Sequence, residues 1–468
     1  MKNWLPPFTL ISPRRAPINC FCVCIGNVVY NQSIYILVCS LVKSPCEYWY
    51  MKVLKFFLRT VSGWPGKEIG ENLMFDKGKY HAIYNTCLSL SFFTLQIWYL
   101  AENASKLSFF ELGHMYVALL MNVLSSSRGF TLCLSDEYRA LAAKFLTNTH
   151  VFFHKDKSNY ARLVYKKVHR LSGGFSAYLF GIMTVALLLF NFVPPYVNYA
   201  KGKFNGYNDP INETFELSLY FKLPFDPERS FRILFRKKIL DPPLNTLRFC
   251  RYGSYLCATS VIMFDLLLSI MVFNQWGHFK ILLHSLNTFP RPAALTANNL
   301  TDFNRLTIMY TPQEQVEVAA KLKDNILYHR FIVDFTNEMS RCFGMVLFIY
   351  YTFHQVSGCL LLLECSQGPE ALARYLPLTV MMTAQLIQIS IIFETIGSMS
   401  EKVKDAVYCL PWEFMNTKNR ATVMIFLINV QEPVHIKAGG LVDVGVTTMA
   451  GILKASLSYF AFLRTISL

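Results

Sequence analysis

Long apolar stretches, separated by shorter polar ones, dominate the chain from about residue 82 to its end. A helix needs about 20 mostly apolar residues to cross the hydrocarbon core of a bilayer. Seven stretches reach that length: residues 82–101, 113–134, 173–194, 255–275, 342–363, 375–394 and 445–464. The pattern therefore predicts an all-α membrane protein with seven transmembrane helices. Residues 18–42 are also apolar, but Asn27, Asn31 and Gln32 interrupt them, so an eighth span remains the alternative.

The basic residues indicate the orientation of these spans. The connection 135–172 carries eight Lys or Arg and three acidic residues, whereas 102–112 and 365–374 carry one Lys or Arg each. Because basic loops stay in the cytoplasm, we expect a cytoplasmic N-terminus and an extracellular C-terminus. The sequons at Asn103 and Asn212 would then lie outside. The connection 195–254 is an exception, since it holds Arg236-Lys237-Lys238 on the predicted outer side.

Composition supports a membrane protein over a soluble one. The chain is 53% hydrophobic and 16% charged, against about 25% charged residues in a typical soluble domain. Its net charge of +15 would suggest nucleic-acid binding in a soluble protein, but here the basic residues lie mostly between apolar runs. Cys20, Cys22 and Cys24 have no histidine nearby, so we expect no metal site and no cofactor.

No motif indicates an enzyme or a transporter. HExxH and GxSxG do not occur in the sequence, and the ten histidines have no ligand spacing. Two related halves with broken helices, expected of many transporters, are not found either. We therefore expect a receptor or a channel, not a catalyst.

The C-terminal quarter carries a specific signature. It reads Pro411-Trp412-Glu413-Phe414-Met415, then Arg420, Gln431-Glu432-Pro433, Ser458-Tyr459-Phe460 and Leu463-Arg464. This run resembles the C-terminal signature of insect odorant receptors, and residues 444–449 look like their lepidopteran pheromone-receptor branch. The resemblance implies a tuning subunit of a ligand-gated, non-selective cation channel in the plasma membrane of olfactory neuron dendrites. It also implies a small volatile organic ligand and a hetero-tetramer with the odorant co-receptor.

The same resemblance divides the chain. Residues 1–50 would be an atypical N-terminal extension, because family members usually begin near the equivalent of Met51. Residues 51–81 would be a cytoplasmic N-terminal region, and 82–394 a ligand-binding bundle of helices one to six. Residues 395–439 would hold a cytoplasmic anchor helix that is amphipathic over 412–430. Gly439-Gly440 would form a flexible break. Residues 440–468 would form the pore-lining helix.

Two other receptor classes stay open as alternatives. A G-protein-coupled receptor would also have seven spans, but its orientation is the reverse. Neither Asp-Arg-Tyr after the third span nor Asn-Pro-x-x-Tyr in the last is present. Gustatory-type relatives usually end with Thr-Tyr and Gln-Phe motifs, whereas this chain has Ser458-Tyr459 followed by Leu463-Arg464.

Helical geometry predicts which residues of the last helix share one face. Stepping 100° per residue places Ala455, Ser458, Phe462 and Ile466 within about 40° of one direction. The resemblance puts the family's gate positions on Phe462 and Ile466 and its polar pore position on Thr465. Bulky apolar side chains can gate a pore by excluding water. Ordinary contacts with lipid or neighbouring helices are the alternative interpretation.

The predicted ligand pocket lies between the second, third, fourth and sixth spans, as the resemblance implies. Its candidate residues are Tyr116, Leu120, Tyr178, Phe180, Met263, Leu267, Met382 and Gln385. Gln385 and the tyrosine hydroxyls could orient an aldehyde, alcohol or acetate, and the methionines could adapt to a flexible chain. Helix packing alone is the alternative for each of them. Asp265 and Lys454 are charges within predicted spans, and the sequence identifies no partner for either.

Overall fold

The computed structural model describes residues 44–71, 78–105, 107, 109–200, 243–296 and 309–466. The apolar run 18–42, the sequon at Asn212 and the basic group Arg236-Lys237-Lys238 lie outside these residues. Residues 44–468 belong to one compact unit of the chain.

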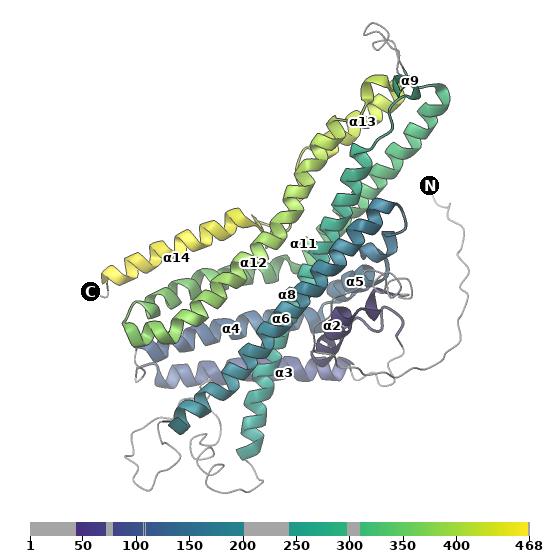
Figure 1. Cartoon of the computed structure of the whole chain (residues 1–468). Helices are drawn as coiled ribbons and strands as arrows, with labels where there is room; N and C mark the ends of the chain where they lie inside the picture. Colours follow the sequence, from purple (N-terminus) through teal and green to yellow (C-terminus); the bar gives the residue numbers. More distant parts are fainter. Residues whose placement is uncertain are drawn as a thin grey trace, which may run out of the picture. The chain divides into compact units, whose positions relative to one another are not determined.

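Helices make up nearly all of the described chain, and one two-stranded hairpin accompanies them (Figure 1). The α-helices are α2 (Trp49–Thr60), α3 (Gly78–Asn103), α4 (Phe109–Leu134), α5 (Asp136–Lys144), α6 (Asn159–Ala200), α8 (Pro243–Asn287), α9 (Ala293–Thr296), α11 (Pro312–Cys365), α12 (Pro369–Tyr408), α13 (Thr417–Asn429) and α14 (Val446–Ile466). The short helical turns are η1 (Pro45–Glu47), η2 (Phe145–Thr149), η3 (Val151–His154) and η4 (Trp412–Phe414). The strands are β1 (Lys437–Ala438) and β2 (Val442–Asp443), paired antiparallel.

The predicted apolar stretches are helical, and several lie within helices much longer than a single span. Five helices of the described chain are long and apolar enough to cross a membrane, and a shorter apolar helix covers Val446–Phe462. The five are Met115–Leu134, Asn159–Leu188, Tyr252–Asn287, Pro312–Cys365 and Tyr375–Phe414. The predicted stretch 82–101 lies in α3, which is helical but not apolar enough to count among the five. The count of seven spans therefore stays a prediction.

Local sequence signals explain where several helices begin. At the start of α11, the Thr311 side chain accepts a hydrogen bond from the Glu314 N–H, and the Glu314 carboxylate accepts one from the Thr311 N–H. This reciprocal capping box satisfies backbone donors that the first helical turn leaves open. The side chains of Ser135 and Asn416 cap α5 and α13 in the same way, each accepting an N–H three residues ahead.

Two predictions for residues 412–440 need correction. The predicted amphipathic helix over 412–430 is divided, because η4 ends at Phe414 and Asn416 then caps a separate helix, α13. The predicted flexible break at Gly439-Gly440 is the ordered turn of the β1–β2 hairpin. Both glycines adopt positive φ, 59° and 73°, a conformation that glycine adopts without steric cost. The Gly439 N–H also donates to the Gly344 carbonyl at 2.8 Å, which fixes the hairpin on α11.

The bundle packs around α8, α11 and α12. Helix α8 lies against α4, α6 and α12, while α11 lies against α4, α12 and α14. Among the largest fully buried side chains are Phe264, Phe343 and Tyr350, together with one cation, Arg128. A buried arginine in an apolar bundle requires a counter-charge, and it is the starting point for the site.

Candidate functional site

A charged pair lies in the interior of the bundle. Arg128 of α4 and Asp265 of α8 are 1% and 2% exposed, and the Arg128 Nη2 lies 2.9 Å from the Asp265 Oδ1. Gln385 of α12 donates from its Nε2 to the other carboxylate oxygen, Oδ2, at 2.7 Å. One carboxylate therefore joins three helices that are distant in sequence.

Aromatic rings of α8 and α11 surround the guanidinium. The Arg128 Cζ lies 5.1 Å from the centre of the Phe264 ring and 5.0 Å from that of Tyr350. Arginine above an aromatic face gains a cation–π attraction that grows as water is excluded. The Arg128 Nη1 also donates to the Val261 carbonyl at 2.7 Å. These contacts supply the buried cation with partners that hydrocarbon cannot offer.

Several polar atoms near this pair have no hydrogen-bond partner among the described residues. They are the Arg128 Nε, the Tyr350 hydroxyl and the His354 Nε2. Tyr350 and His354 are one turn apart on α11, with ring centres 4.3 Å apart. We call Arg128, Asp265, Gln385, Tyr350 and His354 the Arg128 cluster. Unsatisfied polar atoms in a buried position are costly and often indicate a functional site.

The sequence identified only part of this cluster. Asp265 and Gln385 were singled out as an isolated charge and as a ligand residue, whereas Arg128 was missed. The signal was present, because Arg128 lies inside the predicted span 113–134, where a charge is as unusual as Asp265 is in the fourth span. Lys454, the other suspected charge, is exposed on α14, and no ion pair joins it to a residue within the described ranges.

The predicted ligand residues fall into two groups. Met263, Leu267 and Met382 are 0%, 3% and 4% exposed, and they lie on α8 and α12 close in sequence to Asp265 and Gln385. Tyr116, Tyr178 and Phe180 are 41–50% exposed on the surface of the single chain. Leu120 is half-buried on α4. The structure thus buries the three candidates on α8 and α12 and leaves three aromatic candidates at the surface.

The last helix, α14, has two different faces. Ile452 and Ser456 are buried, and the Ser456 hydroxyl donates to the Gln355 carbonyl of α11 at 3.3 Å. Of the predicted pore residues, Ala455 is half-buried, whereas Ser458, Phe462 and Thr465 are exposed. Ile466 is the last residue of α14, and its side chain lies outside the described residues. Ser458, Phe462 and Thr465 therefore belong to the broad surface of α14 that does not pack within this chain.

The signature around Trp412 to Arg420 has a structural explanation. The Phe414 carbonyl accepts from the Tyr310 N–H at 3.0 Å and from the Gln315 Nε2 at 3.3 Å. Asn419 then donates to the Gln315 Oε1 at 2.9 Å, and Arg420 donates to the Glu413 carbonyl at 2.9 Å. The first three of these bonds attach η4 and α13 to the start of α11, and the fourth joins α13 to η4.

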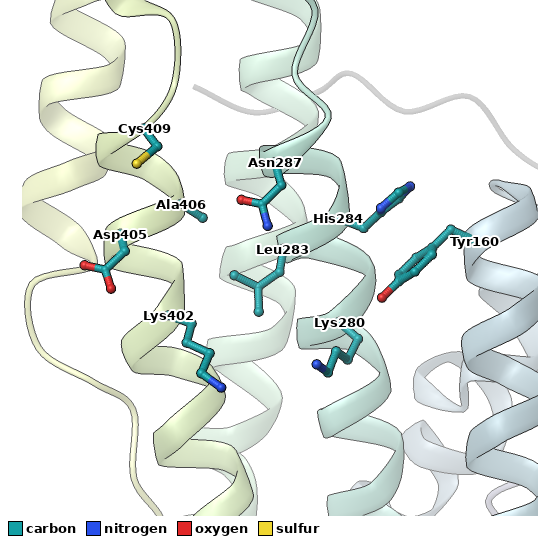
Figure 2. Close-up of a pocket in the computed structure, with 9 residues that line it drawn as sticks. All are labelled: Tyr160, Lys280, Leu283, His284, Asn287, Lys402, Asp405, Ala406 and Cys409. Atoms are coloured by element: carbon teal, nitrogen blue, oxygen red, sulfur yellow. The ribbon is translucent and has the colours of Figure 1, made fainter.

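A hollow lies between α6, α8 and α12, and no residue of the Arg128 cluster lines it (Figure 2). Its volume is about 420 Å³, and its lining comprises Tyr160, Lys280, Leu283, His284, Asn287, Lys402, Asp405, Ala406 and Cys409. Figure 2 shows Lys280 on α8 and Lys402 on α12 facing one another across the hollow. The Tyr160 and His284 rings stack with centres 3.8 Å apart, which holds one wall.

Buried histidines occupy the connection between α5 and α6. His150 is 1% exposed, and its Nδ1 accepts a hydrogen bond from the Phe152 N–H at 3.1 Å. Burial lowers the pKa of His150 from 6.5 to about 3, and the nearby His169 contributes to the same shift. The neutral ring is therefore the folded form. Within the described ranges, no group of three or more His, Cys, Asp or Glu residues is placed to hold a metal ion.

Comparison with known proteins places this architecture in a family. The sequence model described as 7tm Odorant receptor matches residues 108–457, well over half of the chain. Odorant receptor 67c of Drosophila melanogaster is 22% identical over 278 residues, or 59% of this chain and 61% of that protein. Putative odorant receptor 85d of the same species is 20% identical over 147 residues, or 31% of this chain and 35% of that protein. The chain thus spans less than two thirds of the length of these relatives.

Solved structures show the same fold. The insect olfactory receptor OR5 from Machilis hrabei in complex with eugenol superposes with a TM-score of 0.67 and 12% identity, covering 89% of this chain and 98% of that chain. The structure described as the same receptor, with no ligand named, gives 0.66 with the same coverage. At such identity the likeness concerns the fold alone, whereas the sequence match concerns descent. The chain belongs to the 7tm odorant receptor family.

Proposed function

We propose that this protein is the odorant-binding subunit of a ligand-gated, non-selective cation channel in the plasma membrane. In this proposal α3 and α14 complete seven spans, with the N-terminus in the cytoplasm and the C-terminus outside. The subunit assembles with the family's co-receptor into a hetero-tetramer. Its ligand is a small volatile, bound among α4, α6, α8 and α12.

The two faces of α14 carry this proposal. A terminal helix that packs on α11 through Ile452 and Ser456 but leaves Phe462 and Thr465 exposed needs an environment for its second face. In a symmetric assembly of such chains, that face would surround a central axis. A ring of bulky apolar side chains, to which this chain contributes Phe462, could close the axis by excluding water, and small or polar residues such as Ser458 could line the open path.

Ligand binding would open the channel by shifting a population. A ligand opens the pore only to the extent that it binds the open arrangement better than the closed one. Helix α11 provides a physical connection, because it carries Tyr350 of the Arg128 cluster and, five residues later, the Gln355 carbonyl that accepts from Ser456 of α14. A change in packing at the cluster would therefore reach the pore helix directly.

Whole-cell recording tests the proposal. Cells expressing this chain with the co-receptor would receive long-chain alcohols, aldehydes and acetates, with G-protein signalling blocked throughout. We expect a fast inward current that persists under the block. Current that requires G-protein signalling would contradict the channel assignment and favour a G-protein-coupled receptor.

A further inference from the structure

The Arg128 cluster fixes the charge state of Asp265. An arginine keeps its proton under all ordinary conditions, and this one is 1% exposed in the bundle. A buried cation needs a counter-charge, and the Asp265 carboxylate at 2.9 Å is the one that the structure supplies. Ionised carboxylate oxygens accept hydrogen bonds and cannot donate them. Asp265 is thus an acceptor toward every neighbour.

This charge determines which way the Gln385 amide faces. An amide has one donor end, NH2, and one acceptor end, the carbonyl oxygen, and either can point to a neighbour. Because Asp265 only accepts, the NH2 group must face it, as the 2.7 Å contact from Nε2 to Oδ2 records. The reversed amide would bring two acceptor oxygens together in a buried position, which is unfavourable. The orientation of the amide therefore follows from the charge of Asp265.

The opposite end of the amide is left as an acceptor. No hydrogen bond from the described residues reaches the Gln385 Oε1, and the side chain is half-buried. On α12 it is flanked by two buried apolar side chains, Met382 and Leu386, which are 4% and 2% exposed. An acceptor beside apolar side chains is suited to a hydrogen-bond donor on an otherwise apolar molecule.

From this arrangement we propose that the receptor selects a ligand with a hydroxyl group, such as a long-chain alcohol, over the acetate or aldehyde of the same chain. The hydroxyl donates to the Gln385 Oε1, while acetates and aldehydes bring only acceptors to it. Asp265 and Arg128 are positioning residues, because they act on the ligand through Gln385. The inference rests on the proposed function and specifies its ligand class.

Dose–response curves for four ligands of equal chain length test this selection. The alcohol, the aldehyde, the acetate and the alkane would each be applied to cells expressing this chain with the co-receptor. One neutral hydrogen bond accounts for about a tenfold difference in affinity. We expect the alcohol to act at about tenfold lower concentration than the acetate and aldehyde. Equal potency, or a preference for the acetate, would overturn the inference and leave the channel assignment standing.

Variants separate the role of Gln385 from general packing. Gln385→Leu removes the proposed acceptor, so the ratio of alcohol to acetate potency should fall about tenfold. Thr383→Val, two residues away and about 200° around α12, is the matched control and should keep the preference. If Gln385→Leu retains the full alcohol preference, the inference is wrong.

A second variant tests the positioning role of the charge pair. Arg128→Met combined with Asp265→Asn removes both charges together, so that no buried charge is left unpaired. The Gln385 amide can then face either way, and the ratio of alcohol to acetate potency should fall several-fold. An unchanged ratio would overturn the positioning role. Silence of the unaltered chain toward all four ligands, beside a responding family member, would contradict the proposed function and this inference together.

Discussion

The interior around Arg128 and the helix α14 differ in whether their side chains find partners within this chain. At Arg128, the counter-charge, the carbonyl and the aromatic faces all come from the same chain. On α14, Phe462 is 62% exposed and Tyr459 is 59% exposed, so this chain leaves them without cover. Under the proposed function, one chain suffices to build the ligand end, whereas other subunits would complete the pore end.

Breaking the charge pair from one side should have the largest effect. Arg128→Met leaves the Asp265 carboxylate buried without its counter-charge, which costs about 3–5 kcal/mol of folding free energy. The double variant Arg128→Met/Asp265→Leu leaves no charge and should recover most of that loss. Thermal unfolding of the detergent-purified protein measures both. If the double variant is as unstable as the single one, the loss does not come from an unpaired Asp265 carboxylate.

Tyr48 and Tyr50, at the start of α2, pack on α6 within the same chain. Tyr50 is 0% exposed and contacts His169 of α6 through its ring, with centres 5.4 Å apart. Tyr50→Ala should cost roughly 3 kcal/mol, in line with other aromatic truncations in cores. Trp49→Ala, at a position that is 49% exposed, is the matched control and should cost much less. Equal losses in thermal unfolding would contradict the packing of residues 48–50 on α6.

The contact between the β1–β2 hairpin and α11 should be weakened by a methyl group added at Gly344. A Cβ at Gly344 would lie 2.9 Å from the Lys437 carbonyl oxygen, a backbone atom that cannot move without displacing β1. Gly344→Ala should therefore cost about 1–3 kcal/mol and shift the base of α14. Gly451→Ala lies on α14 with nothing within 4 Å of the new methyl, and it should be neutral or stabilising. Unfolding temperatures that rank the two variants the other way would refute this contact.

Acidification should produce the smallest effect. Because the pKa of His150 falls from 6.5 to about 3 on folding, the unfolded chain binds a proton below pH 6.5 that the folded chain does not. Its contribution to stability is thus complete above pH 6.5 and is lost as the pH falls, by at most about 1.4 kcal/mol per pH unit. His150→Asn should flatten this dependence between pH 7 and pH 5. A variant with the unaltered slope would exclude His150 as its source.

The apolar stretches predicted the helices well, because length and hydropathy are local properties of the sequence. The extent of those helices was not predictable in the same way. Helix α12 continues to Tyr408, past the predicted boundary at residue 394, since nothing in the sequence there stops a helix. The Gly439-Gly440 turn was mistaken for a flexible break, because its order depends on Gly344, almost a hundred residues away.

The sequence indicated part of the candidate site, but not which of its residues are in contact. Asp265 and Gln385 stood out in apolar spans, yet only the packing of α4, α8 and α12 brings Arg128 to them. The half-exposed positions of Tyr116, Tyr178 and Phe180 could not be deduced either, since periodicity alone does not say which neighbour a helix face meets. Membership of the lepidopteran pheromone-receptor branch stays a prediction.

Cysteine accessibility on α14 tests the central claim most directly. Phe462→Cys and Leu457→Cys both introduce a thiol at an exposed position of this helix, but the two positions lie about 140° apart around its axis. A charged, thiol-reactive reagent applied during ligand-evoked current should block Phe462→Cys channels and spare both Leu457→Cys and the unaltered chain. Block at Leu457→Cys with none at Phe462→Cys would contradict a pore lined by this face of α14.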